Sequence, residues 1–424
     1  MNFIKKIFQT QLFKISALNS FSVLVRLGIG LITSKLLAVF VGPGGLALVG
    51  NFRNFTSSLE SLSTLGFQTG IVKYVAENKD NKLQLQKIIS TVFISLIVVT
   101  VLMSGVLFFF AFYWNEKIFG NSYEYQFVFK VAALTLPLIA VSVFFISVIN
   151  GLGNYKKVIW TTILGSIIGL LVSLYLVINY KIEGALLAVI ISPAILFFFV
   201  FYLLNKELPF LDFLSLRCFD SQILKKLSSY SLMILVSAIL SPLVLISIRN
   251  RVITNIGIEQ AGYWETITRL SSFYMLFSST ILTVYFFPKL AEAKNNLETK
   301  QVFWSYYKSI LPLFVIGLTV IYFLRFFIIE LLFTKEFLPV SSLFFWQLLG
   351  DVFKVASLIL GFQFFAKKLT MAFILSEIFS FVVLYFLSIY LITIFGLQGV
   401  VIAHALDNFI YLLVLGVYFR KSLF

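Results

Sequence analysis

The sequence is poor in the residues that carry most metal and enzyme chemistry. Its 424 residues include one cysteine, Cys218, and one histidine, His404. A single cysteine excludes an intramolecular disulfide, and a single histidine argues against a His-rich metal centre or a histidine-dependent dyad. The patterns G-x-x-x-x-G-K-[ST], H-E-x-x-H and C-x-x-C do not occur. We therefore expect no metal, no cofactor and no P-loop hydrolysis of ATP, and we expect that the protein is not an enzyme.

Charged residues are also scarce. Charged residues make up 12% of the chain and hydrophobic residues 60%. In a soluble domain, about 25% of the residues are charged and about 45–50% are apolar. A bilayer core of about 30 Å needs roughly 20 apolar helical residues. The sequence thus predicts an all-α integral membrane protein with twelve transmembrane helices. The expected spans are 15–41, 46–72, 88–113, 125–149, 158–180, 182–204, 227–254, 259–287, 301–325, 339–366, 369–394 and 397–419.

The net charge of +15 follows the membrane topology. Lysine and arginine gather in alternate loops between the expected spans, and such loops lie in the cytoplasm. This places both termini in the cytoplasm and makes a nucleic-acid partner improbable. The opposite side holds few basic residues, which are Lys117, Lys130, Lys181, Arg249, Arg251, Arg325 and Lys335.

A weak repeat relates the two halves of the chain. Lys73 and Lys289 are 216 positions apart, and each comes shortly before an Ala-Glu pair, in the segments KYVAE and KLAE. Gly184 and Gly399 are 215 positions apart. Two halves with an even number of spans keep the same orientation, so their pseudo-two-fold axis runs along the membrane normal. The expected parts are an N-terminal lobe of residues 1–204, a cytoplasmic connector of residues 205–226 and a C-terminal lobe of residues 227–424.

Ionisable residues within the spans are candidates for function. Each costs about 2.5–3.5 kcal/mol at the bilayer centre, so it usually faces a bundle interior or a wet cavity. The set is Arg26, Lys35, Arg53, Glu60, Glu265, Arg269, Asp351, Lys354, Glu377 and Asp407.

Three arginines stand out as possible ligands of an anion. Arg53 and Arg269 are 216 positions apart and occupy equivalent places in the two lobes, and Arg26 lies near the middle of the first span. Arginine binds phosphate with two parallel charge-assisted bonds. The alternative is structural: Arg26 pairs with Glu60, and Arg269 pairs with Glu265 one turn before it. Arg53 lies about 10 Å along the helix from Glu60, so we expect it to be the least neutralised.

The remaining charges favour structural interpretations. Asp351 and Lys354 have the spacing of an intrahelical ion pair. Glu377 and Asp407 have no local cation and can be protonated, pair across helices or carry protons that couple transport. His404 lies one turn before Asp407, which favours a polar pair over a proton relay.

Two helix-breaking positions could act as hinges. Gly28 interrupts the first span, and Pro242 interrupts the seventh at nearly the equivalent place, since 242 − 215 = 27. Glycine and proline allow membrane helices to bend, although a static kink is an equal alternative. Lys35, in the first span with Arg26, supports a cationic cavity and would repel a cationic substrate.

Two segments carry a resemblance to a known family. Residues 35–53, KLLAVFVGPGGLALVGNFR, and residues 345–354, FWQLLGDVFK, resemble Wzx-type flippases of O-antigen and enterobacterial common antigen. The resemblance implies the multidrug/oligosaccharidyl-lipid/polysaccharide (MOP) exporter superfamily, with a cavity that opens alternately to each side. It implies an undecaprenyl-pyrophosphate-linked oligosaccharide as substrate, a bacterial inner membrane, and a polysaccharide polymerase and chain-length regulator as partners.

The resemblance also implies a site. The related lipid II flippases carry cavity arginines on helices 1, 2 and 8, where Arg26, Arg53 and Arg269 fall. Two other functions stay open: a cation-coupled multidrug antiporter of the same superfamily, and a membrane glycosyltransferase or ligase that uses lipid-linked sugars.

Overall fold

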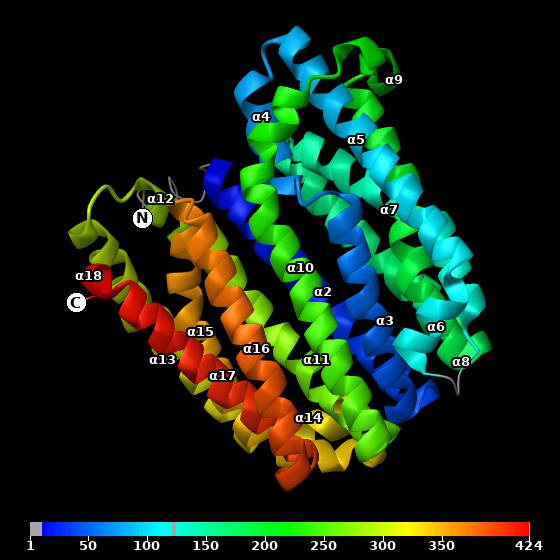
Figure 1. The fold of residues 1–424 in the computed structure, drawn as a ribbon, viewed down its shortest axis with the longest axis vertical. Helices are drawn as coiled ribbons and strands as arrows, with labels where there is room; N and C mark the ends of the chain where they lie inside the picture. Colours follow the sequence, from blue (N-terminus) through cyan, green and yellow to red (C-terminus); the bar gives the residue numbers. More distant parts are fainter. Residues whose placement is uncertain (1–10, 121–123, 424) are drawn as a thin grey trace. The chain divides into compact units, whose positions relative to one another are not determined.

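The chain is helical throughout the part that is described. The computed structural model describes residues 11–120 and 124–423 (Figure 1). The helices are α2 (Gln11–Phe40), α3 (Gly42–Ser63), α4 (Gln68–Asn78), α5 (Lys82–Phe109), α6 (Ala111–Phe119), α7 (Gln126–Gly151), α8 (Tyr155–Glu207), α9 (Phe210–Phe213), η1 (Leu216–Cys218), α10 (Ser221–Asn255), α11 (Ile258–Ile281), η2 (Leu282–Phe286), α12 (Phe287–Glu292), α13 (Asn296–Phe323), α14 (Arg325–Leu332), η3 (Lys335–Leu343), α15 (Phe344–Ala366), α16 (Thr370–Phe395), α17 (Leu397–Tyr418) and α18 (Arg420–Leu423).

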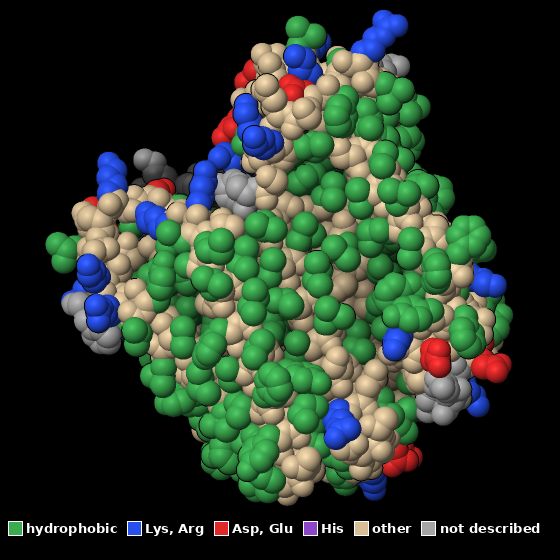
Figure 2. Space-filling view, viewed as in Figure 1, with side chains coloured by type: hydrophobic (Ala, Val, Ile, Leu, Met, Phe, Trp, Pro, Cys, Tyr) green, Lys and Arg blue, Asp and Glu red, His purple; other side chains and the backbone are tan. Residues whose placement is uncertain are grey.

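Among the described residues, ten helices are long and apolar enough to cross a membrane. Their outer surfaces are apolar: the side chains of Phe109, Phe198 and Phe323 are 83%, 65% and 74% exposed. Figure 2 shows hydrophobic side chains over the helices, with lysine, arginine and acidic residues mostly near the helix ends. A helix satisfies its own backbone hydrogen bonds, so only its side chains need to match the lipid. The predicted all-helical membrane class is confirmed.

Helix α8 contains a sharp break. It has 53 residues, and a straight helix of that length would measure about 80 Å, far more than a bilayer. Lys181 has φ 49° and ψ −120° inside it, between the predicted spans 158–180 and 182–204. The two arms meet again at their far ends, where Asn154 donates a hydrogen bond to Glu207 at 2.7 Å. Helix α8 is therefore a helical hairpin.

The same backbone conformation recurs 215 residues later. Gly396, between α16 and α17, has φ 58° and ψ −136°, close to the angles of Lys181, and 396 − 181 = 215. The turns that precede these hairpins also correspond, since Gly153 and Lys368 both have positive φ, 86° and 54°, and 368 − 153 = 215. The repeat read from the sequence is thus matched by the local backbone.

The interior of each hairpin repeats as well. A Cβ on Gly184 would lie 1.9 Å from the carbonyl oxygen of Leu176, and one on Gly399 would lie 2.2 Å from that of Leu391. Both pairs are eight residues apart, and both sets differ by 215 positions. Only glycine allows so close a backbone approach.

One expected span ends early. Residues 46–72 were expected to form one helix, but α3 stops at Ser63 and α4 starts at Gln68. Leu65 and Gly66 between them have φ of 54° and 61°, a left-handed conformation that ends a right-handed helix.

The chain divides into two compact units. The first comprises the described residues up to Leu36 together with Phe55–Ala238, and the second comprises Leu37–Asn54 together with the residues from Ile239 onward. In the first unit, α7 packs against α5 and α8. In the second, α17 packs against α15 and α16.

The connector is fixed to the first unit. Ser90 of α5 donates to the carbonyl of Phe213 and accepts from the amide of Ser215, at 3.2 and 3.1 Å. Thr91 accepts from the amide of Asp220 at 3.0 Å. Phe210 is buried among aromatic side chains that include Phe145, at a centroid distance of 4.7 Å.

Candidate functional site

A buried carboxylate joins two arginines in the second unit. Oε1 of Glu265 accepts a hydrogen bond from Nη2 of Arg53 at 2.6 Å, and Oε2 accepts one from Nη2 of Arg249 at 2.7 Å. The side chains of Glu265 and Arg249 are 2% and 1% exposed, whereas that of Arg53 is 40% exposed. Arg53 is therefore the accessible end of an otherwise buried ion-pair network.

Glycines bring the helices that carry these residues together. A Cβ on Gly262 of α11 would lie 1.9 Å from the carbonyl oxygen of Pro43 at the start of α3. A Cβ on Gly50 would lie 2.4 Å from Oε2 of Glu265. Small residues let membrane helices approach closely, and this approach lets Arg53 of α3 reach Glu265 of α11.

Arg249 has partners on several sides. Its Nη1 donates to Oδ1 of Asn51 at 3.0 Å, and Nδ2 of Asn51 donates to Oδ1 of Asn250 at 2.9 Å. Its guanidinium carbon lies 5.0 Å from the centroid of the Trp264 ring, within the range of a cation–π contact. These contacts stabilise a guanidinium that has almost no access to solvent.

Arg269 lies one turn after Glu265 on α11. It is 9% exposed, and its Nη1 has no hydrogen-bond partner among the described residues. We call Arg53, Arg249, Arg269 and Glu265 the arginine cluster. Three guanidinium groups and one carboxylate leave two positive charges in excess, so the cluster can bind an anion that carries more than one charge.

The structure differs from two sequence-based interpretations of these arginines. Arg53 was expected to be the least neutralised, but it is bonded to Glu265. The structural alternative for Arg269, a pair with Glu265, is not formed within the described residues, because the two oxygens of Glu265 face Arg53 and Arg249. The partner of Arg53 lies 212 positions away in the sequence, so helical spacing could not identify it.

Sequence reasoning also misplaced Arg249. It was counted with the basic residues of the external side, near the end of the expected span 227–254, but it is buried within α10. The run Arg-Asn-Arg at 249–251 is typical of a span end, and Arg251 is indeed exposed. The available signal was that Arg249 lies five residues inside the end of the expected span 227–254.

In the first unit, the structural alternative for Arg26, an ion pair with Glu60, is not formed among the described residues. Arg26 is exposed, and no ion pair joins these two side chains in the described part of the chain. Glu60 lines a small cavity whose other lining residues are mostly apolar, among them Leu136 and Pro193. Lys35 is half-buried on α2.

A second buried carboxylate, Asp351, lies elsewhere in the second unit. It has no exposed surface. Its Oδ2 accepts from the hydroxyls of Ser271 and Tyr274 at 2.7 and 2.5 Å, and its Oδ1 accepts from Nε2 of His404 at 3.0 Å. The predicted ion pair with Lys354 is not formed among these residues, because the oxygens of Asp351 face α11 and α17, whereas Lys354 is exposed.

His404 lies between Asp351 and Asn408. Nδ2 of Asn408 donates to the carbonyl oxygen of His404 at 2.8 Å and lies 3.2 Å from its Nδ1. Because a carboxylate oxygen accepts, Nε2 of His404 is the donor toward Asp351. The predicted polar pair of His404 with Asp407 is wrong, since Asp407 accepts from Ser380 at 3.1 Å.

The other predicted residues are placed as follows. Glu377 accepts from the hydroxyl of Tyr411 at 3.2 Å. Gly28 lies within α2, with nothing within 4 Å of a Cβ added there, and Pro242 lies within α10. A coupling role for the carboxylates and a hinge role for Gly28 and Pro242 stay predictions.

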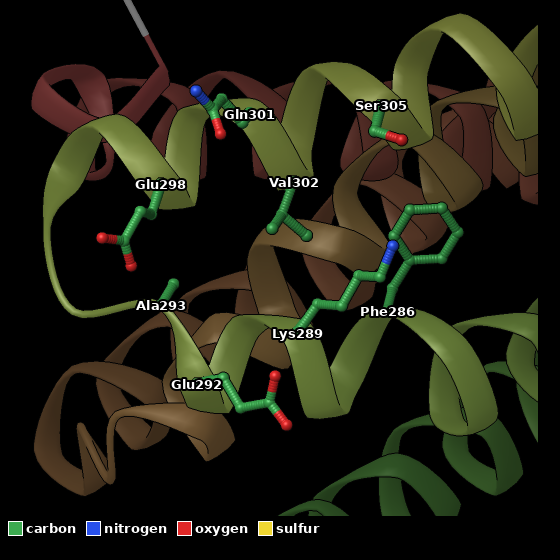
Figure 3. Close-up of a pocket in the computed structure, with 8 residues that line it drawn as sticks. All are labelled: Phe286, Lys289, Glu292, Ala293, Glu298, Gln301, Val302 and Ser305. Carbon is green, nitrogen blue, oxygen red and sulfur yellow. The ribbon is translucent and has the colours of Figure 1, made fainter.

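A surface cavity of about 350 Å³ lies between α12 and α13 (Figure 3). Figure 3 shows Lys289 and Glu292 on one helix facing the cavity, with Val302 opposite. Lys289 donates a hydrogen bond to the hydroxyl of Tyr285 at 2.6 Å. Glu298, in the first turn of α13, accepts one from the backbone amide of Lys294 at 2.7 Å. Because carboxylates stand beside its lysine, this cavity is a poorer anion site than the arginine cluster.

The fold defines the class of protein. An inward-facing transporter of the multidrug resistance MATE family of the MOP superfamily matches with a TM-score of 0.74 and 16% identity, covering 95% of this chain and 98% of that chain. The lipid II flippase MurJ in an inward closed conformation matches with a TM-score of 0.72 and 16% identity, covering 96% and 87%. The chain is an all-helical membrane protein with the fold of the MOP superfamily.

The family follows from the sequence comparisons. A family model described as polysaccharide biosynthesis protein matches residues 13–294. The lipid III flippase of Escherichia coli (strain K12) is 30% identical over 403 residues, which cover 94% of this chain and 95% of the relative. The chain belongs to the polysaccharide biosynthesis family, as the Wzx-type resemblance predicted. It is a multi-pass membrane protein of a transporter family and not an enzyme.

Proposed function

We propose that the chain is a flippase that moves a polyprenyl-pyrophosphate-linked oligosaccharide from the cytoplasmic to the external leaflet for surface polysaccharide synthesis. The observation that carries this proposal is the 30% identity to a lipid III flippase along 94% of the chain. The cationic excess of the arginine cluster supports it, because a pyrophosphate is the charged part of such a substrate.

Arg53 and Arg269 are the proposed pyrophosphate ligands. Arg53 is partly exposed and can present its guanidinium to an anion. Arg269 has an unpartnered Nη1 among the described residues, and a buried polar group without a partner gains most from a ligand that supplies one. Arg26, which is exposed on α2, is proposed as a further ligand on the basis of the family resemblance.

Alternating access driven by the membrane potential is the proposed mechanism. Moving two negative charges outward is favoured by an inside-negative potential, and at about 100 mV it releases roughly 5 kcal/mol, or about 2.3 kcal/mol for each charge. Transport therefore needs no ATP. Proton coupling through Glu377 or Asp407 is a separate prediction.

We infer twelve spans in two lobes, residues 1–204 and 227–424, from two features. The ten candidate spans count the two arms of α8 as one helix and do not include α3. Counting the arms separately and adding α3 gives twelve spans. The hairpin of α8 and the hairpin of α16 and α17 share their backbone angles at an offset of 215. We also propose a bacterial inner membrane with both termini in the cytoplasm.

The single cysteine offers a test of this topology. Cys218 is a free cysteine in the connector, so a membrane-impermeant maleimide should label it in inverted vesicles and not in intact spheroplasts. Labelling only in intact spheroplasts would show that the connector lies outside the cytoplasm and would contradict the proposed orientation.

The function is tested in proteoliposomes with a defined lipid-linked glycan, with and without an imposed potential. Wild-type protein should expose the glycan to an external glycosidase, faster with the inside negative. Arg53→Ala should abolish this exposure and still insert, and Arg251→Ala, an exposed arginine nearby, should behave as wild type. Normal flipping by Arg53→Ala would contradict the site.

The same liposomes separate the alternatives. Uptake of a cationic dye in exchange for protons or sodium would favour a multidrug antiporter. Transfer of the glycan to an acceptor by the purified protein would favour a glycosyltransferase or ligase, and neither is expected.

A further inference from the structure

The arginine cluster contains its own anion. Glu265 is the one carboxylate among three guanidinium groups, and it uses both oxygens, Oε1 toward Arg53 and Oε2 toward Arg249. An anion that binds Nη2 of Arg53 on the side of Oε1 must therefore compete with a carboxylate already in place.

The two bonds of Glu265 differ in their surroundings. The partner on Oε2, Arg249, is 1% exposed, whereas the partner on Oε1, Arg53, is 40% exposed. An ion pair open to a polar surrounding is weak and exchangeable, whereas a buried one is hard to break because it leaves an uncompensated charge. The Arg53 bond is the one that can be exchanged.

The carboxylate is held in place while this exchange occurs. Gly50 lies directly against it, with room for no side chain, and Arg249 is anchored in turn by Asn51 and the ring of Trp264. When Arg53 turns to another anion, Glu265 stays paired with Arg249. The exchange thus leaves no buried charge without a partner.

We propose that Glu265 is a built-in counter-anion that a pyrophosphate must displace from Arg53, and that returns to Arg53 when the pyrophosphate leaves. This inference rests on the proposed function. The displacement lowers the affinity for the lipid-linked pyrophosphate and speeds its release. It also disfavours small, singly charged anions, which gain too little from one guanidinium to replace a held carboxylate. Glu265 is thus a positioning residue that tunes affinity and release.

The test measures binding and turnover separately in the full-length protein. Undecaprenyl pyrophosphate is titrated into wild type and Glu265→Gln in nanodiscs, and flipping is measured with the lipid-linked glycan. Glu265→Gln should bind about tenfold tighter, which corresponds to about 1.4 kcal/mol, and should flip more slowly at saturation. Glu259→Gln, which removes an exposed carboxylate from the same helix, should change neither. Unchanged or weaker binding by a folded Glu265→Gln would overturn the inference.

Two further variants protect the test from a folding defect. Glu265→Asp keeps a charge for Arg249 but shortens the reach to Arg53, and it should also bind more tightly than wild type. In an Arg53→Ala background, Glu265→Gln should no longer change the affinity, because the competition needs both residues. A gain that persists in that background would overturn the inference. Wild-type protein that neither binds nor flips would instead overturn the proposed function itself.

Discussion

Gly50 and Glu265 share a space that only one side chain can fill: a Cβ on residue 50 would lie 2.4 Å from Oε2 and 2.6 Å from Cδ of Glu265. The carboxylate is fixed in turn by Arg249 at 2.7 Å. A glycine on α3 is therefore part of the arginine cluster although it carries no functional group.

Gly50→Ala should destabilise the protein. The added methyl group must push Glu265 away from Arg249, and overpacking of this kind costs about 1–3 kcal/mol. The melting temperature in detergent should fall. Gly317→Ala is the matched control, because nothing lies within 4 Å of a Cβ there, and alanine in an exposed helix gains roughly 0.5–1 kcal/mol. Equal melting temperatures for the two variants would contradict the close contact.

The same substitution should destabilise the protein strongly at Arg249 and hardly at all at Arg251. Arg249→Gln removes the guanidinium that Oε2 of Glu265 and Oδ1 of Asn51 accept from, and breaking a buried ion pair costs about 3–5 kcal/mol. Arg251 is exposed, so Arg251→Gln should change stability by at most about 0.5 kcal/mol. The fraction of monodisperse protein after heating measures both. Equal stability of the two variants would contradict the burial of Arg249 within α10.

Lys181 and Gly396 should also behave as opposites. Both have positive φ with ψ near −120° to −136°, a region that only glycine adopts without strain of about 1–3 kcal/mol. Lys181→Gly should therefore raise the melting temperature, and Gly396→Ala should lower it. A loss of stability in Lys181→Gly would show that the lysine side chain supports the hairpin more than its backbone strains it.

The Asp351 network should show a graded response. Asp351→Asn places an amide nitrogen where hydroxyl or ring donors point, and losing hydrogen bonds to a charged group costs about 2–4 kcal/mol in all. Ser271→Ala removes one donor of several and should cost about 1 kcal/mol. Thermal unfolding of both variants measures the two losses of stability. A larger loss for Ser271→Ala would contradict the central place of Asp351 among these hydrogen bonds.

The ends of some membrane helices were predictable from the sequence. Expected spans 125–149, 369–394 and 397–419 lie within two residues of α7, α16 and α17, because lipid demands long apolar helices whatever their neighbours are. The break at Lys181 was also marked, by a charged residue between two apolar runs. The resemblance in residues 35–53 and 345–354 indicated the family.

Most partners within the site were not predictable. Helical spacing offered Glu265 to Arg269, Lys354 to Asp351 and Asp407 to His404, and the structure forms none of these pairs among its described residues. Their partners lie on other helices, up to 212 positions away, and Arg249 was assigned to the wrong environment altogether.

The sequence by itself determined that this protein is a bundle of membrane helices, since hydrocarbon selects apolar side chains one helix at a time. Only the tertiary structure decided which arginine meets Glu265, because that depends on how closely Gly50 and Gly262 let two helices approach. Hydrophobic burial acts on each residue separately, whereas a buried charge is satisfied only by a partner placed in three dimensions.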